Sequence, residues 1–169
     1  MLERARSETH ATTIEYQCCD LDVLDLEPHS ADLAFRPLTL HHVHDLDRLL
    51  SAIAETLTPG GSLVFPVQHP MFSAPSVQEL ETTADGGRFW PLDNYLVEGE
   101  RVRHWCVDGV VKQHRTVATY VNTVINAGLD IDRLVEWGSS ADDLEARPEL
   151  ADDLHRPWFL LLSVTKPVA

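Results

Sequence analysis

Four residues that lie close together in the sequence are of types that bind metal ions or transfer protons: His41, His42, His44 and Asp45. Three imidazoles and a carboxylate are ligands that zinc accepts in proteins. Adjacent residues of an extended segment point to opposite sides, however, so His41 and His42 are poorly placed to approach one ion together. Asp45 also suits the N-cap position of the apolar helical pattern that follows it. The sequence therefore favours a helix cap over a metal site, and no metal is expected.

A second candidate pair, Cys18 and Cys19, is adjacent in the chain and cannot easily chelate a metal either. Burial as small apolar side chains is the expected fate of such cysteines. With Cys106 the chain has three cysteines, which do not form a disulfide framework.

Composition excludes several classes of function. The 169 residues include 27 acidic and 13 basic side chains, with a formal net charge of −14. Such a surface repels phosphate groups, so neither nucleic acid nor an anionic membrane is an expected partner. The longest apolar run, 158–162, is far shorter than the ~20 residues that span a bilayer. No apolar stretch near Met1 is typical of a signal peptide. These features predict an acidic, cytoplasmic protein of one domain.

Alternating strands and helices must position any site. Residues 13–18 alternate between apolar and polar and predict a short strand. The apolar run 31–40 predicts a buried strand that ends near Pro37, and 62–67 predicts a third strand. Between these two strands an apolar stripe over 46–57 predicts a helix that stops at the Pro59-Gly60-Gly61 sequence. This order indicates an α/β fold with a largely parallel sheet.

The pattern is interrupted between residues 70 and 114. Tryptophans and a tyrosine occur there among charges, and Asp108-Gly109 between two apolar triplets predicts a hairpin turn. We expect an inserted lid built around this β-hairpin. A helix capped by Thr116 and closed by Gly128 follows. Two further strands are then expected, at 131–137 and 158–165. A polar loop with a short helix, at 139–153, separates them.

Several segments resemble class I S-adenosylmethionine (SAM)-dependent methyltransferases, in particular the methyltransferase type 11-like group. They are Ala31-Asp32-Leu33-Ala34-Phe35, Leu40-His41-His42-Val43 and Leu57-Thr58-Pro59-Gly60-Gly61-Ser62-Leu63-Val64-Phe65. In that family they would belong to the fourth strand, the approach to the following helix, and the fifth strand. Later pieces, among them Gln68-His69-Pro70, Asn94-Tyr95 and Arg156-Pro157, resemble a subgroup that acts on small molecules. The resemblance covers nearly the whole chain.

One hallmark of the family is missing from the sequence. The family binds SAM through a Gly-rich loop after its first strand, where glycines let the backbone approach the ligand. None of the eight glycines of this chain is spaced as G-x-G. Met1-Leu2 and Ala5 resemble family residues that follow the end of the second strand. The resemblance therefore implies a C-terminal portion of the domain that lacks both SAM anchors.

The family's strand order, 3-2-1-4-5-7-6, gives this absence a physical consequence. Without strands one and two, the predicted strand 13–18 is separated from the others, and one edge of the strand at 31–40 is bare. An unpaired apolar edge invites pairing with another chain. We expect a homodimer through this edge, a rearranged pairing, or a longer protein.

The resemblance also implies site residues. Asp20 and Leu21 fall where the family contacts adenine, and Leu38, Leu40 and His41 would line the methionine end of the pocket. The alternative is that Asp20 is an acidic loop residue and that 38–41 is an ordinary strand end. The missing glycine loop favours this alternative.

The candidate substrate residues lie in the insert and directly after it. They would form an apolar wall or bind an anionic acceptor. They are Trp90, Tyr95, Arg101, Trp105, His114 and Arg115. His69, just past the predicted fifth strand, is the candidate general base, because a histidine can take a proton near neutral pH. The alternative is that the aromatics pack on the core while the arginines pair with acids.

Together these observations predict an α/β fold: a partial Rossmann-like class I methyltransferase sheet, strands 3 to 7 of the family, with a β-hairpin lid. A single truncated domain would have its core at 1–69 and 115–169 and its substrate insert at 70–114. The expected function is SAM-dependent methyl transfer to a small molecule, with the SAM site completed by another chain or by a further N-terminal segment. The alternative is a non-catalytic remnant of the fold that acts as a binding or interaction module.

Overall fold

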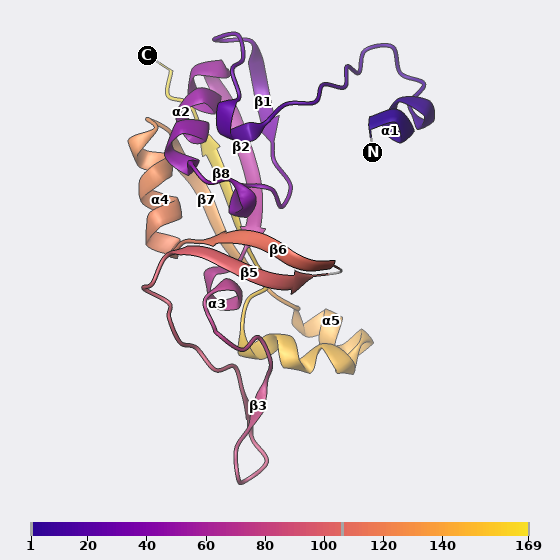
Figure 1. Cartoon of the computed structure of the whole chain (residues 1–169), viewed down its shortest axis with the longest axis vertical. Helices are drawn as coiled ribbons and strands as arrows, with labels where there is room; N and C mark the ends of the chain where they lie inside the picture. The colour runs from indigo at the N-terminus through magenta and orange to yellow at the C-terminus, as the bar shows by residue number, and fades with distance from the viewer. Residues whose placement is uncertain (1, 106, 169) are drawn as a thin grey trace.

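A four-stranded sheet forms the centre of the molecule (Figure 1). The computed structural model describes residues 2–105 and 107–168, and side chains except those of 104–108. The strands are β1 (Ala31–Phe35), β2 (Leu57–Gln68), β7 (Asp130–Trp137) and β8 (Phe159–Thr165), in the order β1-β2-β8-β7. β1 and β2 are parallel, and β8 runs antiparallel to both of its neighbours. This order corresponds to strands 4-5-7-6 of the expected family, and it confirms the α/β fold class.

Two helices, α2 (Leu46–Thr56) and α4 (Val117–Asn126), pack against one another beside the sheet. Their buried residues meet alternate side chains of the central strands, as the two-residue period of a strand requires. The core is contiguous and includes Leu49, Leu50 and Ile53 from α2, Leu63, Phe65 and Val67 from β2, Tyr120 and Val124 from α4, and Leu160, Leu162 and Val164 from β8.

Both helices begin at the predicted caps. The Asp45 carboxylate accepts a hydrogen bond from the Arg48 amide at 3.0 Å, and the Thr116 hydroxyl accepts one from the Thr119 amide at 3.1 Å. α2 ends at Thr56, one residue before the end of the predicted stripe, but the following strand begins at Leu57 and not at residue 62, so the Pro59-Gly60-Gly61 segment lies inside β2. The amide of Gly60 donates to the Lys166 carbonyl at 2.9 Å, so this segment is held beside the C-terminal end of β8.

The predicted strand at 13–18 was also wrong. This stretch has no regular secondary structure, and Ile14, one of its apolar residues, is half exposed. The stretch pairs with none of the described strands, and an alternating sequence does not form a strand without such pairing. The short helix α1 (Leu2–Glu8) stands apart from the sheet at the far end of the same segment (Figure 1).

The absence of a further strand leaves β1 at the edge of the described sheet. Leu33 and Phe35 of β1 are 63% and 60% exposed, respectively, which is high for apolar strand residues. The bare edge that the sequence predicted is therefore present in the structure.

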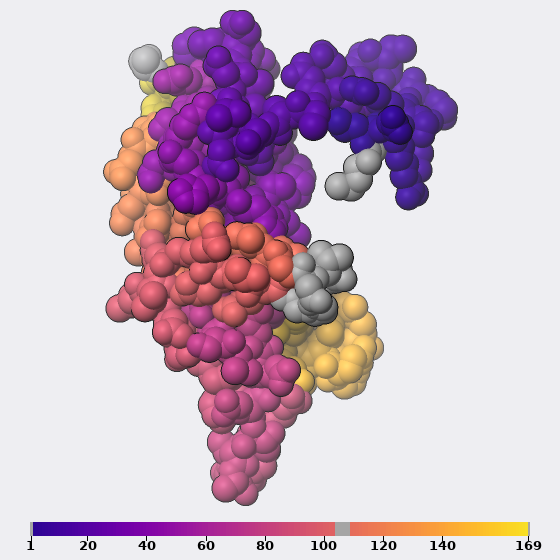
Figure 2. Space-filling view, in the orientation of Figure 1, coloured from indigo at the N-terminus to yellow at the C-terminus, as the bar shows by residue number. Residues whose placement is uncertain are grey.

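Between β2 and α4 the chain leaves the sheet. It forms α3 (Pro70–Ser73), a small hairpin of β3 (Glu81–Thr82) and β4 (Arg88–Phe89), and a longer hairpin of β5 (Gly99–Trp105) and β6 (Val107–His114). The β3–β4 hairpin projects from the body of the molecule (Figure 2).

The longer hairpin was predicted, but its turn was placed wrongly. Trp105 pairs with Val107, so the predicted turn residues, Asp108 and Gly109, lie within β6. Gly109 has a φ of +78°, which glycine adopts without strain.

The polar stretch between β7 and β8 contains α5 (Ala141–Ala146) and a 3₁₀ helix, η3 (Pro148–His155). Two more 3₁₀ turns, η1 (Leu21–Val23) and η2 (Leu40–His42), precede α2. In the described part of the chain, no helix has the length and apolar character needed to cross a bilayer.

Replacement of Leu50 tests how far stability depends on the packing of α2. Leu50 is fully buried, so Leu50→Ala leaves a cavity and should lower the free energy of unfolding by about 2–5 kcal/mol in urea titrations. Leu96, 84% exposed in the insert, provides the same chemical change as a control; Leu96→Ala should alter stability by less than about 0.5 kcal/mol. Equal effects of the two changes would contradict this description of the core.

Candidate functional site

A cavity of about 180 Å³ lies where the inserted hairpin meets the C-terminal end of β2. It is lined by Leu38, His41, His42, Gln68, Val110, Lys112, Trp158 and Phe159. Four parts of the chain therefore contribute to its wall: the connection after β1, the end of β2, the strand β6 and the beginning of β8. In open α/β sheets, ligands bind in crevices outside the carboxyl ends of the strands, and this cavity has that position.

Gln68, the last residue of β2, connects the two sides of the cavity. Its side-chain oxygen accepts a hydrogen bond from the Lys112 ammonium at 3.1 Å. Its backbone amide donates to Nδ1 of His41 at 3.4 Å. All three residues are buried, with exposed fractions of 5–8%. The hydrogen bonds hold the insert, through Lys112, against the core.

Burial determines the charge of the cavity. Burial, together with weaker repulsion from the neighbouring His42, Lys112 and Arg115, lowers the pKa of His41 to about 3. His41 is therefore neutral at pH 7; because its Nδ1 accepts from Gln68, its ring proton lies on Nε2. Burial and the nearby Arg103 also lower the pKa of Lys112.

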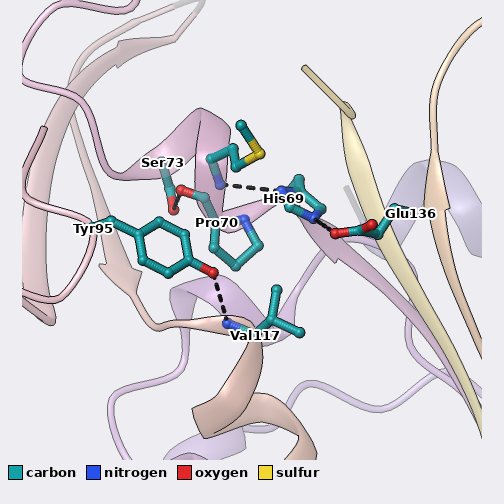
Figure 3. A network of polar contacts seen from close by, with 7 residues as sticks. His69, Pro70, Ser73, Tyr95, Val117 and Glu136 are labelled. Carbon is teal, nitrogen blue, oxygen red and sulfur yellow. Dashed lines mark hydrogen bonds and ion pairs between the residues drawn. The ribbon is translucent and has the colours of Figure 1, made fainter. Parts of the chain in front are cut away.

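His69, the expected general base, is 1% exposed at the start of α3. Its Nδ1 accepts from the Met71 amide at 3.1 Å, so Nε2 carries the proton and donates to Glu136 on β7 at 3.0 Å (Figure 3). Burial lowers the pKa of His69, while Glu136 acts in the opposite direction. Both nitrogens thus connect elements of the fold, and proton transfer through Nδ1 would require release of the Met71 amide. The base assignment stays a prediction.

Two of the predicted substrate residues join the insert to α4. His114 is fully buried; its Nδ1 accepts from the Ser73 hydroxyl at 2.7 Å, and its Nε2 donates to the Tyr95 carbonyl at 2.9 Å. The Tyr95 hydroxyl accepts from the Val117 amide at 3.4 Å (Figure 3). The contacts of His114 and Tyr95 therefore position the insert at the beginning of α4.

The predicted arginines bind backbone carbonyls. Arg115 donates to Val43 and His44, each at 2.8 Å, and so holds the segment that carries η2. Arg101 donates to the carbonyls of Val97 and Glu100 within the insert. The side chain of Trp105 lies outside the described residues.

Trp90 belongs to an aromatic cage around Arg156. The Arg156 guanidinium carbon lies 3.9–4.5 Å from the ring centroids of Phe72, Trp90 and Trp158. Arg156 is 8% exposed, and its buried Nε and Nη1 have no hydrogen-bond partner in the described structure. The ring faces offset part of the cost of burying this cation. Trp158 also lines the cavity, so the cage supports one of its walls.

The residues predicted to hold SAM separate into two groups. Leu38 and His41 line the cavity, whereas Leu40 is fully buried in the core behind it. Asp20 caps η1, its carboxylate accepting from the Asp22 amide at 3.0 Å, and Leu21 begins that turn. η1 packs against α2, and the Asp22 side chain accepts from the backbone amide of Asp45 at 3.0 Å.

Lys112 and Gln68 line the cavity although the sequence analysis did not name them as site residues. Of the six predicted substrate residues, the five whose side chains the structure describes do not contribute to its lining. A signal was present: Val110, Lys112 and His114 are two residues apart on one strand, so they share a face. A lysine on the same face as a predicted site histidine was a detectable candidate.

Solved structures establish the family. A SAM-dependent methyltransferase from Mesorhizobium loti superimposes with a TM-score of 0.93 and 44% identity, over 98% of this chain and 76% of that one. The chain belongs to the class I SAM-dependent methyltransferases. A proposed methyltransferase of this type from Listeria monocytogenes gives a TM-score of 0.85 at 31% identity, over 98% of this chain and 75% of that one.

Two sequence comparisons agree with membership of the methyltransferase family. Residues 1–65 match the family described as a methyltransferase domain. A Haemophilus influenzae protein without an assigned function is 29% identical over 137 residues, which is 80% of this chain and 54% of that protein. The methyltransferase chain thus spans about half the length of this curated relative.

The buried histidines predict acid sensitivity. Burial lowers the pKa of His41, His69 and His114 in the folded state, so the unfolded chain binds more protons below its histidine pKa of 6.5. The contribution of the neutral histidines to the free energy of unfolding is fully present above pH 6.5. It decreases as the pH is lowered, and for His41 the decrease continues down to about pH 3. Each such histidine contributes a slope of about 1.4 kcal/mol per pH unit.

Urea titrations between pH 7 and pH 5 measure this slope. His41→Phe should reduce it by about one proton, whereas His10→Gln, at an exposed position in the N-terminal segment, should leave it unchanged. A wild-type stability that is constant or rises over this interval would contradict the burial of neutral histidines.

Proposed function

We propose that this chain forms part of a SAM-dependent methyltransferase that acts on a small molecule. The acceptor binds in the cavity between the end of β2 and the insert, so residues 70–114 act as a substrate lid on the core of 1–69 and 115–169. The observation that carries this proposal is the position of the cavity at the carboxyl ends of β1 and β2, in a chain that belongs to the family.

The donor site is the less complete part. Asp20 is exposed, and the contact made by its carboxylate is to its own turn, so an adenine amino group fits there as a donor. Leu21 offers a backbone amide, and Leu38 and His41 would form the opposite side, with the buried Leu40 packed in the core and not exposed to the ligand. The chain has no G-x-G loop for the methionine end. We infer that another segment, from a longer chain or a second copy, completes this end of the site.

SAM, when bound, supplies an electrophilic methyl group that the acceptor attacks in line. The task of the chain is to orient the acceptor and to exclude water, because alignment of the reacting atoms removes much of the entropic barrier. Leu38, Trp158 and Phe159 provide the apolar wall, and Gln68 and Lys112 the polar groups. An oxygen or nitrogen acceptor must also lose a proton, for which His69 remains the proposed base.

The missing glycine loop favours a second candidate function, a binding module without catalysis. The two proposals predict different behaviour toward S-adenosylhomocysteine, since a module that lost the donor site has no contact to offer it.

Titration of the ¹⁵N-labelled chain with millimolar S-adenosylhomocysteine distinguishes the two. Methyltransferase function predicts concentration-dependent shifts of the amides at Asp20, Leu21 and Leu38. Asp20→Ala should abolish the shifts at η1, whereas Asp25→Ala, an exposed acid nearby, should preserve them. Unchanged spectra of the wild-type chain at the highest soluble concentration of S-adenosylhomocysteine would exclude a donor site formed by this chain alone and favour the binding module.

We also propose that two copies associate through the exposed edge of β1, where Leu33 and Phe35 are exposed. Light scattering after size exclusion should then give a mass that rises from 19.0 kDa toward twice that value with concentration. Leu33→Lys should keep the chain monomeric, because a charge on an edge strand opposes pairing, whereas Leu96→Lys in the insert should not. A wild-type chain that is monomeric at every concentration would refute edge pairing.

A further inference from the structure

The cavity is a site of positive charge in a strongly acidic protein. Lys112 lies in its wall, and the eight lining residues of the described structure include no carboxylate. Arg115 and Arg103 do not line the cavity; Arg115 donates to backbone carbonyls that include that of Leu40, and Arg103 donates to the carbonyls of Ser73 and Pro75. Lys112 therefore places a basic side chain in the wall of this cavity, although the chain as a whole has a formal net charge of −14.

The ammonium of Lys112 is held in place. It is 5% exposed, and the hydrogen bond to Gln68 at 3.1 Å directs one of its three N–H groups. Lys112 lies in β6, whose partner β5 holds it in register, so its position is set by a paired strand and not by a loop. A hydrogen bond from a charged donor in such a buried setting is stronger than one between neutral groups.

Half of the eight lining residues are apolar, and the space is small. Leu38, Val110, Trp158 and Phe159 contribute alkyl and aromatic surface. The volume of about 180 Å³ equals roughly six water molecules at the ~30 Å³ that each occupies in the liquid. The cavity therefore suits a single ring or a short chain with one polar end.

We propose that this cavity selects a small carboxylic acid as the acceptor, whose carboxylate accepts a hydrogen bond from Lys112 while its apolar part lies against Trp158 and Phe159. The inference rests on the proposed function, and it adds the substrate class and a specificity-determining residue. Lys112 orients the acceptor by its anionic end.

Benzoate and its neutral isostere benzamide test this selection on the full chain without SAM. Ligand-observed NMR at constant ionic strength should give a dissociation constant for benzoate at least tenfold lower than for benzamide, because a charge-assisted hydrogen bond contributes about 1.5–3 kcal/mol and each 1.4 kcal/mol is tenfold. Equal affinities, or no binding of benzoate at 50 mM, would overturn the proposal.

Lys112→Met, which preserves the length of the side chain, should remove the preference for benzoate and leave benzamide binding unchanged. Arg4→Met removes one positive charge from the exposed helix α1 and should have no effect. A preference that survives in Lys112→Met would show that Lys112 does not recognise the anion. If this variant does not fold, amide shifts of the wild-type chain decide: benzoate must shift Val110, Lys112 and Gln68, and their constancy refutes the site.

These measurements separate the inference from the proposed function. Benzoate selection does not require the donor, and the S-adenosylhomocysteine titration reads η1 and not the insert. Loss of benzoate selection with intact donor binding refutes the acceptor class alone. Loss of donor binding with intact selection refutes the methyltransferase proposal and leaves a carboxylate-binding site that is not an acceptor site.

Discussion

The pairing of β2 on both of its edges is the constraint on which the rest of the structure depends. β2 pairs in parallel with β1 and antiparallel with β8 over most of its length. Its alternate residues Leu63, Phe65 and Val67 are fully buried, so register and burial specify the same arrangement. Because the strand is fixed in this way, its final residue, Gln68, and the following His69 reach defined positions at the edge of the core.

The insert depends on that position. The contacts that attach it to the core include the Lys112 bond to Gln68, the His114 and Tyr95 network at α4, and the cage around Arg156. Each buries a basic or titratable group, and burial of such a group is costly unless it is well paired or surrounded by ring faces. The insert is therefore attached by a few specific polar and cation–π contacts in addition to apolar packing.

Local patterns in the sequence predicted most of the core. Two kinds of local signal located both helices: the caps at Asp45 and Thr116, and the apolar stripes. These signals depend only on near neighbours in the chain. The strand expected at 13–18 failed, since a strand needs a pairing edge that local alternation cannot supply. The partners of Trp90 and Lys112 were equally out of reach: the cage around Arg156 and the bond to Gln68 join residues 66 and 44 positions apart, respectively.

The division of the cavity between two parts of the chain has an evolutionary consequence. The core supplies Gln68, His41 and the beginning of β8, whereas the hairpin supplies Val110 and Lys112. Exchange of one hairpin for another would therefore replace the part of the cavity wall that carries Lys112 and leave the sheet intact. The residues that line this cavity can therefore change through one contiguous segment of about 45 codons, while the sequence that folds the sheet and its helices stays the same.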